Sequence, residues 1–464
     1  MNPLGPLFEP KSVALVGASH SETRLGGVVL KNLLRFKGKV YPINPKYDEL
    51  MGIKAYREVS DIPEPVDLAL ILRPAPEVPD ILREFRGRAR FVIVMSSGFA
   101  EVGETALQEE VRRIGKESGF RTVGPNCMGL YNPHKALDTF FLPQERIRRP
   151  KRGNVAIVSQ SGAILSCLLG AVRDANAGVS KAIGYGNAVD VAEADLYEYL
   201  AYDKKTDVVI SYIESVDDGR KFIARAKELT DKKPLLILKA GKGSSGQAAA
   251  FSHTGRLAGR YEVFHSIVSQ FGIREAADFD ELMDATKALS YQRPSKGNKV
   301  CIITNGGGSG VLAADECMRQ GLDVVGISGE TKARLQHLFP HFFVVNNPVD
   351  LTAQVQDEDY VTVLRELADD YDGFLLISLP NVFGITEKLG ELLTAAKKNL
   401  NKPVTANIAQ SGITGKITSM LERALIPVYP SPERAVRGLK ALLTGNAPAP
   451  CKRGVQNLPL TPPW

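Results

Sequence analysis

Short apolar runs alternate with amphipathic stretches along most of the chain. Runs rich in Val, Ile and Leu predict strands, and stretches such as Gln108–Ser118, Gly219–Leu229 and Tyr360–Leu367 predict helices between them. Continuous apolar strands separated by helices are typical of parallel sheets covered on both faces. The predicted strands are Ser12–Val16, Val40–Ile43, Val66–Leu72, Phe91–Met95, Val155–Val158, Val208–Ile213, Leu235–Leu238, Val300–Thr304, Val324–Ile327, Phe374–Ser378 and Val404–Ile408. We therefore predict an α/β protein of Rossmann-like and flavodoxin-like parallel-sheet domains.

Two polar segments rich in turn residues interrupt this pattern. They are Pro143–Asn154 and Tyr291–Lys299, and each ends where a new apolar strand begins. We expect three domains, over residues 1–145, 150–290 and 297–445, followed by a proline-rich tail over 446–464. The basic run Arg146–Arg152 reads as a solvated linker between the first two.

Composition supports this picture and excludes several classes of protein. At roughly 150 residues per domain, 464 residues fit about three domains. No apolar run reaches the ~18 residues of a membrane span, and residues 1–10 lack a signal-peptide pattern. The five cysteines form no CxxC pair, which argues against disulfides or zinc and for the cytoplasm. A net charge of +6 with one Trp disfavours nucleic acid and suits anionic small molecules.

Glycine-rich loops follow several predicted strands, where α/β sheets bind ligands. Gly17 follows the first strand, and Gly26 and Gly27 precede a helix that starts near Val28. The spacing is not G-x-G-x-x-G. Lys46 follows the second strand, where an NAD site would carry an acidic residue, so a phosphorylated nucleotide is favoured over NAD. A packing loop with a surface lysine is the alternative interpretation.

Further loops of the same kind predict an anion site. Ser97 and Asn126 follow strands of the first domain. In the second domain a strand runs into the sequence SQSG (159–162) and then into a helix, a nest of hydroxyl and N–H groups suited to phosphate. The sequence GYGN (184–187) is a further loop of this domain, and Glu214 stands at the end of the predicted strand VVISYIES.

One histidine stands out among six. His253 lies in the small-residue loop Gly241–Gly255, just before a helix, and a neutral imidazole is nucleophilic. A carboxylate such as Glu214 could hold its other ring nitrogen. A P-loop at Lys242 is rejected because Gly243 stands where Ser or Thr is needed. The histidines show no metal-binding spacing, so we expect no metal site.

Taken together, these motifs carry a family resemblance. The segments GASHSETRLGG, INPK, SSGFAEVGE, GPNCMGLYNP, SQSGA, GYGN and SHTGRLAGRYEVF resemble the α subunits of ADP-forming acetyl-CoA synthetases, in the succinyl-CoA synthetase superfamily. The resemblance continues through ITNGGGSGV and NNPVDLT in the third domain. These later segments favour the acetate-type family over succinyl-CoA synthetase.

The resemblance implies a reversible reaction in which acyl-CoA, ADP and phosphate give an acid, CoA and ATP. An acyl phosphate forms first, and a histidine then carries the phosphoryl group. The resemblance implies His253 as the phosphorylated residue and Glu214 as its stabiliser. It further implies phosphate contacts at Ser159, Ser161 and Gly162, acyl-phosphate contacts at Gly186 and Asn187, and CoA contacts at Gly17, Ala18, Ser19, Gly26, Lys46, Ser97 and Asn126.

The nucleotide site of this family is expected elsewhere. The chain has no ATP-grasp-like segment, so the resemblance implies a β subunit that holds ADP or ATP and Mg²⁺, in an α2β2 assembly. The run Gly306–Gly310 reads as a strand-to-helix turn, with phosphate binding as the alternative. A non-catalytic CoA- or acyl-CoA-sensing regulator is the competing hypothesis, and an NAD-dependent dehydrogenase a weaker third. The acyl group and the choice between ADP and GDP stay open.

Overall fold

The computed structural model describes residues 3–247 and 260–444. Two compact units make up the chain: unit 1, Met1–Phe279, and unit 2, Asp280–Trp464. Three main sheets, two in unit 1 and one in unit 2, consist mostly of parallel strands. The predicted α/β class is confirmed.

The first sheet has the strand order β2-β1-β5-β6-β7, and all its pairs are parallel. Short elements β3 and β4 form a hairpin outside it. The elements of this part of unit 1 are α1 (Gly5–Phe8), β1 (Ser12–Val16), α2 (Leu25–Leu33), β2 (Lys39–Ile43), β3 (Glu49–Leu50), β4 (Ile53–Lys54), β5 (Val66–Ile71), α3 (Val78–Glu84), β6 (Ala89–Val94), α4 (Thr105–Ser118) and β7 (Arg121–Val123).

The second sheet has the order β14-β13-β12-β10-β11-β8-β9. Its first five strands are parallel, and β8 pairs antiparallel with β11. Its elements are β8 (Gly129–Asn132), β9 (Leu137–Asp138), β10 (Arg152–Ser159), α5 (Gly162–Asp174), β11 (Val179–Gly184), α6 (Glu193–Tyr202), β12 (Val208–Ile213), α7 (Gly219–Thr230), β13 (Leu235–Lys239), α9 (Tyr261–Gln270) and β14 (Arg274–Glu275).

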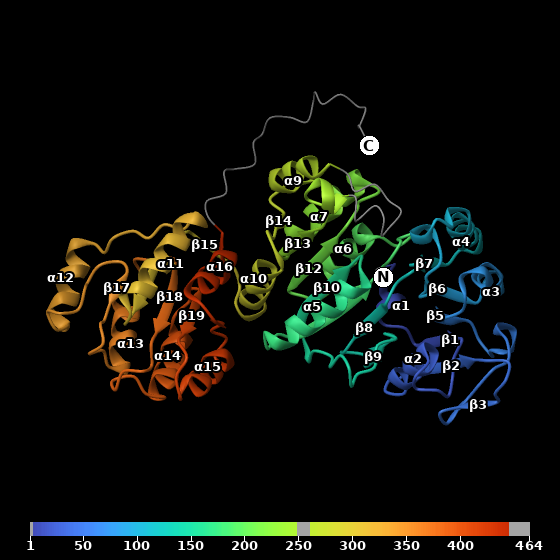
Figure 1. The fold of residues 1–464 in the computed structure, drawn as a ribbon, viewed down its shortest axis with the longest axis horizontal. Coiled ribbons are helices and arrows are strands. Elements are labelled where there is room, and N and C mark those ends of the chain that lie inside the picture. The colour runs from blue at the N-terminus through green and yellow to red at the C-terminus, as the bar shows by residue number, and fades with distance from the viewer. Residues whose placement is uncertain (1–2, 248–259, 445–464) are drawn as a thin grey trace. The chain divides into compact units, whose positions relative to one another are not determined.

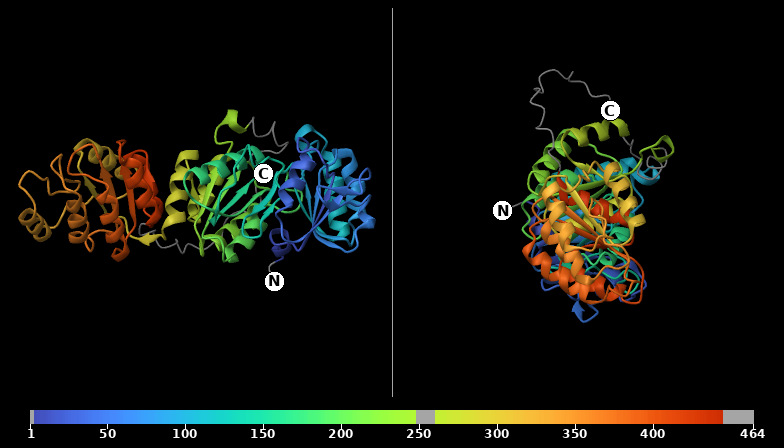
Figure 2. Two further views of the ribbon diagram at one scale, coloured as in Figure 1. Left: turned by 90° about the horizontal axis from the view of Figure 1, so that it is seen from below. Right: turned by 90° about the vertical axis from the view of Figure 1, so that its left-hand side faces the viewer.

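The third sheet lies in unit 2 and has the parallel order β17-β16-β18-β19-β20. Figures 1 and 2 show helices arranged along the sheets. The elements of unit 2 are α10 (Phe279–Tyr291), β15 (Ser295–Lys296), β16 (Val300–Thr304), α11 (Gly307–Arg319), α12 (Gly329–Leu338), β17 (Val349–Asp350), α13 (Asp357–Glu366), β18 (Gly373–Ser378), α14 (Lys388–Asn399), β19 (Val404–Ile408), α15 (Thr414–Arg423), β20 (Val428–Tyr429), α16 (Pro432–Leu442) and β21 (Leu443–Thr444).

The parallel strands of all three sheets follow one topology. Counted in chain order within each sheet, the order is 2-1-3-4-5. In such sheets the strand order reverses between the first and third strands, and ligands bind at the carboxyl ends beside this point. The reversals fall between β1 and β5, between β10 and β12, and between β16 and β18.

Apolar clusters cover both faces of the strands. In β16, for example, Cys301 and Ile303 belong to one cluster, whereas Val300 and Ile302 belong to another. Successive residues of a strand point to opposite faces, so the sheet is buried on both sides. This explains why these strands read as unbroken apolar runs.

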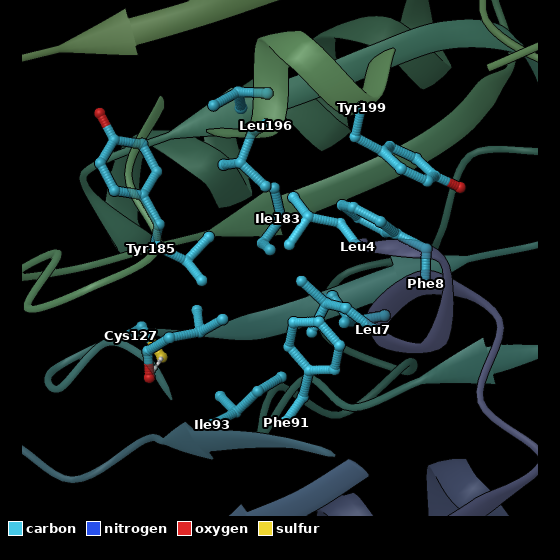
Figure 3. Close-up of a cluster of buried hydrophobic side chains, with 14 of the residues drawn as sticks. Leu4, Leu7, Phe8, Phe91, Ile93, Cys127, Ile183, Tyr185, Leu196 and Tyr199 are labelled. Carbon is cyan, nitrogen blue, oxygen red and sulfur yellow. Dashed lines mark hydrogen bonds between the residues drawn. The ribbon is translucent and has the colours of Figure 1, made fainter. Parts of the chain in front are cut away.

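The two sheets of unit 1 share one hydrophobic cluster. Helix α1 lies within it, and the ring of Phe8 stacks on Tyr199 of α6 with centroids 4.6 Å apart. Figure 3 shows these side chains gathered together, from α1, β6, β11 and α6. The first and second sheets are therefore held in one packed arrangement.

The strand predictions need correction. The longest strand that the sequence analysis missed is β11, because Ser180 and Lys181 interrupt its apolar run; both side chains are buried. The predicted strand Val324–Ile327 is wrong: Val325 is exposed, and this stretch forms no ladder in the described structure. The place beside β16 is taken by β17 instead.

The two units divide at the start of helix α10, one helix earlier in the chain than the break expected at Tyr291–Lys299. Unit 2 begins at Asp280, inside α10. Within unit 2, Asp284 of α10 is buried and accepts hydrogen bonds from Arg434 of α16, the closest at 2.7 Å. The division of unit 1 at 145–150 stays a prediction.

Among residues 3–247 and 260–444, none of the helices has the length and apolar character needed to cross a membrane.

A buried ion pair fixes the longest strand that the sequence analysis missed. Nζ of Lys181 lies 2.6 Å from Oδ2 of Asp203, and the two side chains are 2% and 8% exposed. Burial alone would raise the pKa of the Asp203 carboxyl, but hydrogen bonds from Lys181 and Thr206 hold that pKa below its ordinary value. The pair thus stabilises unit 1 only while Asp203 is ionised.

We expect Lys181→Met to destabilise unit 1 by about 3–5 kcal/mol, since it leaves a buried carboxylate without its cation. Urea unfolding at neutral pH measures this. Because the pKa of Asp203 is lowered, the difference from wild type should shrink as the pH falls below about 4. Lys227→Met is the matched control: it breaks an exposed pair with Asp231 and should cost less than about 1 kcal/mol. Equal losses in the two variants would contradict the interpretation.

Candidate active site

A cavity of about 710 Å³ lies in unit 1, where the carboxyl ends of the first and second sheets converge. One wall follows β5, β6 and β7, and the other follows β10, β11 and β12. Its lining includes Leu72, Arg73, Met95, Ser97, Asn126, Gln160, Ser161, Gly162, Gly186, Asn187 and Glu214. Both strand-order reversals of unit 1 therefore border one cavity.

The loop between β1 and α2 folds tightly back on itself beside this cavity. A Cβ built on Gly26 would lie 1.9 Å from the carbonyl oxygen of Gly17, so only glycine fits there. The cap residue Arg24 makes no side-chain capping bond to α2. This close approach brings the first turn of α2 beside the end of β1, an arrangement suited to phosphate groups.

Asn44 joins the β1–α2 loop to the segment after β2. Its Nδ2 donates to the carbonyl oxygen of Ala18 at 2.8 Å, and its Oδ1 accepts from the backbone N–H of Lys46 at 2.9 Å. Lys46 is exposed next to the loop, where its ammonium can meet an anion. Ala18 is fully buried, and Oγ of Ser19 accepts from the N–H of Ser21.

The segment after β7 connects the two walls of the cavity. The backbone N–H of Asn126 donates to the carbonyl oxygen of Ser96 at 2.8 Å. Its Nδ2 donates to Oδ1 of Asn187 at 3.4 Å. Ser97, by contrast, is exposed at the cavity edge.

Asn187 is placed in the cavity lining, but its side chain also has structural partners. Nδ2 donates to Oε2 of Glu101 at 2.6 Å and to Oε1 of Gln108 at 2.9 Å. A Cβ on the preceding Gly186 would lie 2.3 Å from the carbonyl oxygen of Pro125. The turn after β11 is therefore locked against the first sheet.

The start of α5 provides the anion-binding end of the cavity. Ser161 is the N-cap, and its Oγ accepts from the N–H of Ile164 at 3.4 Å. Ser159, just before, is fully buried and donates through Oγ to the carbonyl oxygen of Ser161 at 2.6 Å. Free N–H groups at the first turn and the helix dipole favour a bound anion there.

Glu214 is held from both sides by buried side chains. Oε1 of Gln160 accepts from the backbone N–H of Glu214 at 2.8 Å and of Ser215 at 3.0 Å. Nζ of Lys239 donates to the carbonyl oxygen of Glu214 at 2.7 Å. The Glu214 carboxylate is itself buried and lines the cavity. Its backbone therefore has little freedom, which fixes the carboxyl group beside the start of α5.

Lys239 is the buried cation next to Glu214. Burial lowers the pKa of its ammonium to about 8, although Glu214 and Glu275 act in the opposite direction. At neutral pH the residue therefore remains mainly protonated, and a moderate rise in pH would neutralise it.

The structure brings together many of the residues singled out from sequence. Those that line the cavity are Ser97, Asn126, Ser161, Gly162, Gly186, Asn187 and Glu214. Others lie outside the lining, in the adjoining loops or beneath the start of α5: Gly17, Ala18, Ser19, Gly26, Lys46 and Ser159. His253 lies outside the described residues.

The sequence analysis missed several contributors. Gln160 stood inside the SQSG motif without a role, and Asn44 inside INPK. Phe141, Leu142 and Ile147 line the cavity although they border or belong to the expected linker. Within the described residues, no group of three His, Cys, Asp or Glu side chains is arranged to hold a metal ion.

Comparison with known proteins identifies relatives along most of the chain. Three family models match it: a CoA binding domain over residues 11–133, a succinyl-CoA ligase like flavodoxin domain over 152–289, and a ligase-CoA domain over 300–441.

Whole-length relatives agree. The α subunit of ADP-forming acetate–CoA ligase II of Pyrococcus furiosus is 38% identical over 94% of this chain and 96% of its own length. The ADP-forming acetate–CoA ligase of Methanocaldococcus jannaschii is 37% identical over 93% of this chain, which spans 62% of that protein.

A solved structure of acetyl-coenzyme A synthetase 1 of Ca. Korarchaeum cryptofilum, in complex with phosphate and ADP, superposes with a TM-score of 0.89 at 34% identity. The match covers 95% of this chain and 96% of that one. The resemblance seen in the motifs is thereby confirmed: the chain belongs to the family of α subunits of ADP-forming acetate–CoA ligases.

Proposed function

We propose that this chain is the α subunit of an ADP-forming acyl-CoA synthetase of the acetate type, which converts acyl-CoA, ADP and phosphate into acid, CoA and ATP. The observation that carries the proposal is the single cavity bordered by the CoA-type loop of the first sheet and by the α5 N-terminus and Glu214 of the second. An acyl-CoA entering from the first sheet would meet phosphate at the second. The competing CoA-sensing hypothesis finds no support among the relatives, whose names denote ligases.

In the first step a phosphate oxygen attacks the thioester carbonyl, and the C–S bond breaks to release CoA. The N–H groups at the start of α5 neutralise charge on the phosphate, and this preorganised field is the main contribution that the protein can make. Ser161 and Gly162 would bind the phosphoryl oxygens, and the Gly186–Asn187 turn, on the same wall of the cavity, would contact the acyl phosphate.

In the second step a ring nitrogen of His253 attacks phosphorus, and the carboxylic acid leaves as its carboxylate. Glu214 would accept a hydrogen bond from the other ring nitrogen and stabilise the positive charge on the ring. The phosphoryl group then passes to ADP. We place that nucleotide, with Mg²⁺, on a partner β subunit bearing an ATP-grasp domain, in an α2β2 assembly.

CoA itself would bind the β1–α2 loop. Its pyrophosphate suits the first turn of α2, and its 3′-phosphate suits the Lys46 ammonium. Asn44 holds both parts of this surface together.

His253→Ala should abolish phosphorylation of this chain. The complex with its β subunit, incubated with radiolabelled ATP and Mg²⁺, should carry acid-labile, base-stable label on the α chain. The matched control is His265→Ala, which removes an exposed histidine bonded to Glu275 and should keep the label. Persistent label on His253→Ala would refute the role of this histidine.

Glu214→Gln should slow phosphoenzyme formation by roughly 100-fold or more, since an orienting carboxylate beside a catalytic imidazole is worth up to about 10⁴ in rate. Rapid-quench measurement of labelled α chain gives this rate. The control Glu198→Gln alters a half-buried pair with Arg225, outside the cavity lining, and should leave the rate unchanged. An unchanged rate in Glu214→Gln would remove this carboxylate from the mechanism.

Lys46→Ala should weaken CoA binding about tenfold, because one charge-assisted contact to phosphate is lost. Calorimetric titration of the full chain with CoA and 3′-dephospho-CoA separates this contact from the rest of the site. Wild type should prefer CoA, and the variant should bind both alike. Lys54→Ala, another exposed lysine of the same region, should behave as wild type; a preference retained by Lys46→Ala would place the 3′-phosphate elsewhere.

A further inference from the structure

The segment between β9 and β10, two strands of the second sheet, is anchored to the protein by the side chain of Arg149. It runs from the end of β9 at Asp138 to the start of β10 at Arg152. Asp138 and Arg149 pair across it, with Nε 2.9 Å from Oδ2 and both side chains 5% exposed. We call residues 139–149 the connector.

Arg149 also fixes the connector backbone. Its Nη1 donates to the carbonyl oxygen of Ile147 at 2.8 Å, and its Nη2 to that of Leu142 at 2.7 Å. At the other end, Nδ2 of the buried Asn32 donates to the carbonyl oxygen of Phe140 at 2.8 Å. A buried ion pair with these extra hydrogen bonds is costly to disrupt, so the connector is rigid.

This rigid connector turns apolar side chains toward the cavity. Phe141, Leu142 and Ile147 belong to its lining, together with Ala163 and Ser166 of α5. The charged connector residues Glu145, Arg146 and Arg148 are exposed and are absent from the lining. Because Arg149 already donates to the carbonyl oxygens of Leu142 and Ile147, the connector offers the cavity mainly hydrocarbon.

The apolar lining reaches the reacting end of the cavity. Met128 is buried, and its Cε would lie 3.5 Å from a Cβ built on Gly162, the first residue of α5. The one cation in the lining, Arg73, is bonded to Glu77 through Nε at 2.9 Å and Nη2 at 2.6 Å. A chain extending from a carbonyl near Gly162 would therefore meet hydrocarbon and no unpaired cation among the described lining residues.

We propose that the connector determines which acyl group the enzyme accepts, with Phe141, Leu142 and Ile147 forming the wall against the hydrocarbon tail of the acyl-CoA. The inference rests on the proposed function, because it takes the cavity to be the acyl-CoA site. Pantetheine, with two amides and a hydroxyl, needs polar partners that this wall does not supply. A fixed wall sets a size limit, and each methylene beyond a pocket's fit changes selectivity by about tenfold or more.

The test is calorimetric titration of the full chain with CoA, acetyl-CoA, butanoyl-CoA and hexanoyl-CoA. In Phe141→Ala and Ile147→Ala, we expect the affinity for hexanoyl-CoA relative to acetyl-CoA to rise about tenfold, because the wall has receded. The affinity for CoA itself should stay within about twofold of wild type, which also shows that each variant is folded. Ser166→Leu, which adds bulk beside the wall, should lower the same ratio.

Phe271→Ala is the matched control: Phe271 is a partly buried phenylalanine packed on the same hydrophobic cluster of unit 1 but outside the cavity. Its acyl preference should equal that of wild type. The proposal is overturned if the ratio in Phe141→Ala and Ile147→Ala is unchanged or moves toward acetyl-CoA, or if all four ligands lose affinity equally, as a pantetheine contact would cause. If wild type binds neither CoA nor any thioester, the proposed function fails as well, so the two failures are distinguishable.

Discussion

The packing of helix α1 between the two sheets of unit 1 is the constraint on which the site depends. Phe8 stacks on Tyr199 of α6, while Leu7 and Phe91 belong to the same buried cluster. Burying such large side chains stabilises the arrangement by a few kcal/mol each. Each sheet on its own would present its loops to solvent. Held by this common core, the two strand-order reversals border a single cavity, so that a ligand bound by one sheet can react with a group on the other.

The same topology appears three times, but its loops differ in what they offer. In the first sheet the turn after β1 is closed by Gly26 against Gly17 and makes room for backbone contacts. In the second, the turn after β10 ends in the capped start of α5, and Gln160 reaches across to Glu214. In the third, Gly306 is the N-cap of α11 and makes no side-chain capping bond, and Gly307–Gly310 already belong to the first turn of the helix. One scaffold thus supports different chemistry because its loops change while its strand order does not.

How much of this could be predicted from sequence depended on whether the signal was local. The apolar strands β1, β6 and β16 were found because their apolar runs are unbroken and both faces are buried. The strand β11 was missed because Lys181 reads as a surface residue until its partner Asp203 is known, 22 positions away. In the basic run, only Arg149 departs from the solvated linker that was predicted. It is one of several basic residues in sequence, and only its pairing with the buried Asp138 distinguishes it. Loop residues that the family resemblance singled out, such as Ser161 and Glu214, line the cavity. Gln160 and Lys239, which hold the backbone of Glu214, belong to no sequence pattern that would identify them.

The hairpin β8–β9 has a consequence for how unit 1 can be divided. It follows the last strand of the first sheet along the chain, yet it pairs antiparallel with β11 at the margin of the second sheet. An exposed edge strand has unpaired N–H and C=O groups, with which other chains can pair and aggregate. Along the chain, the strands of the second sheet therefore begin at Gly129. A gene fusion or a circular permutation that cut the chain at residue 145 would separate the second fold from its own border strands.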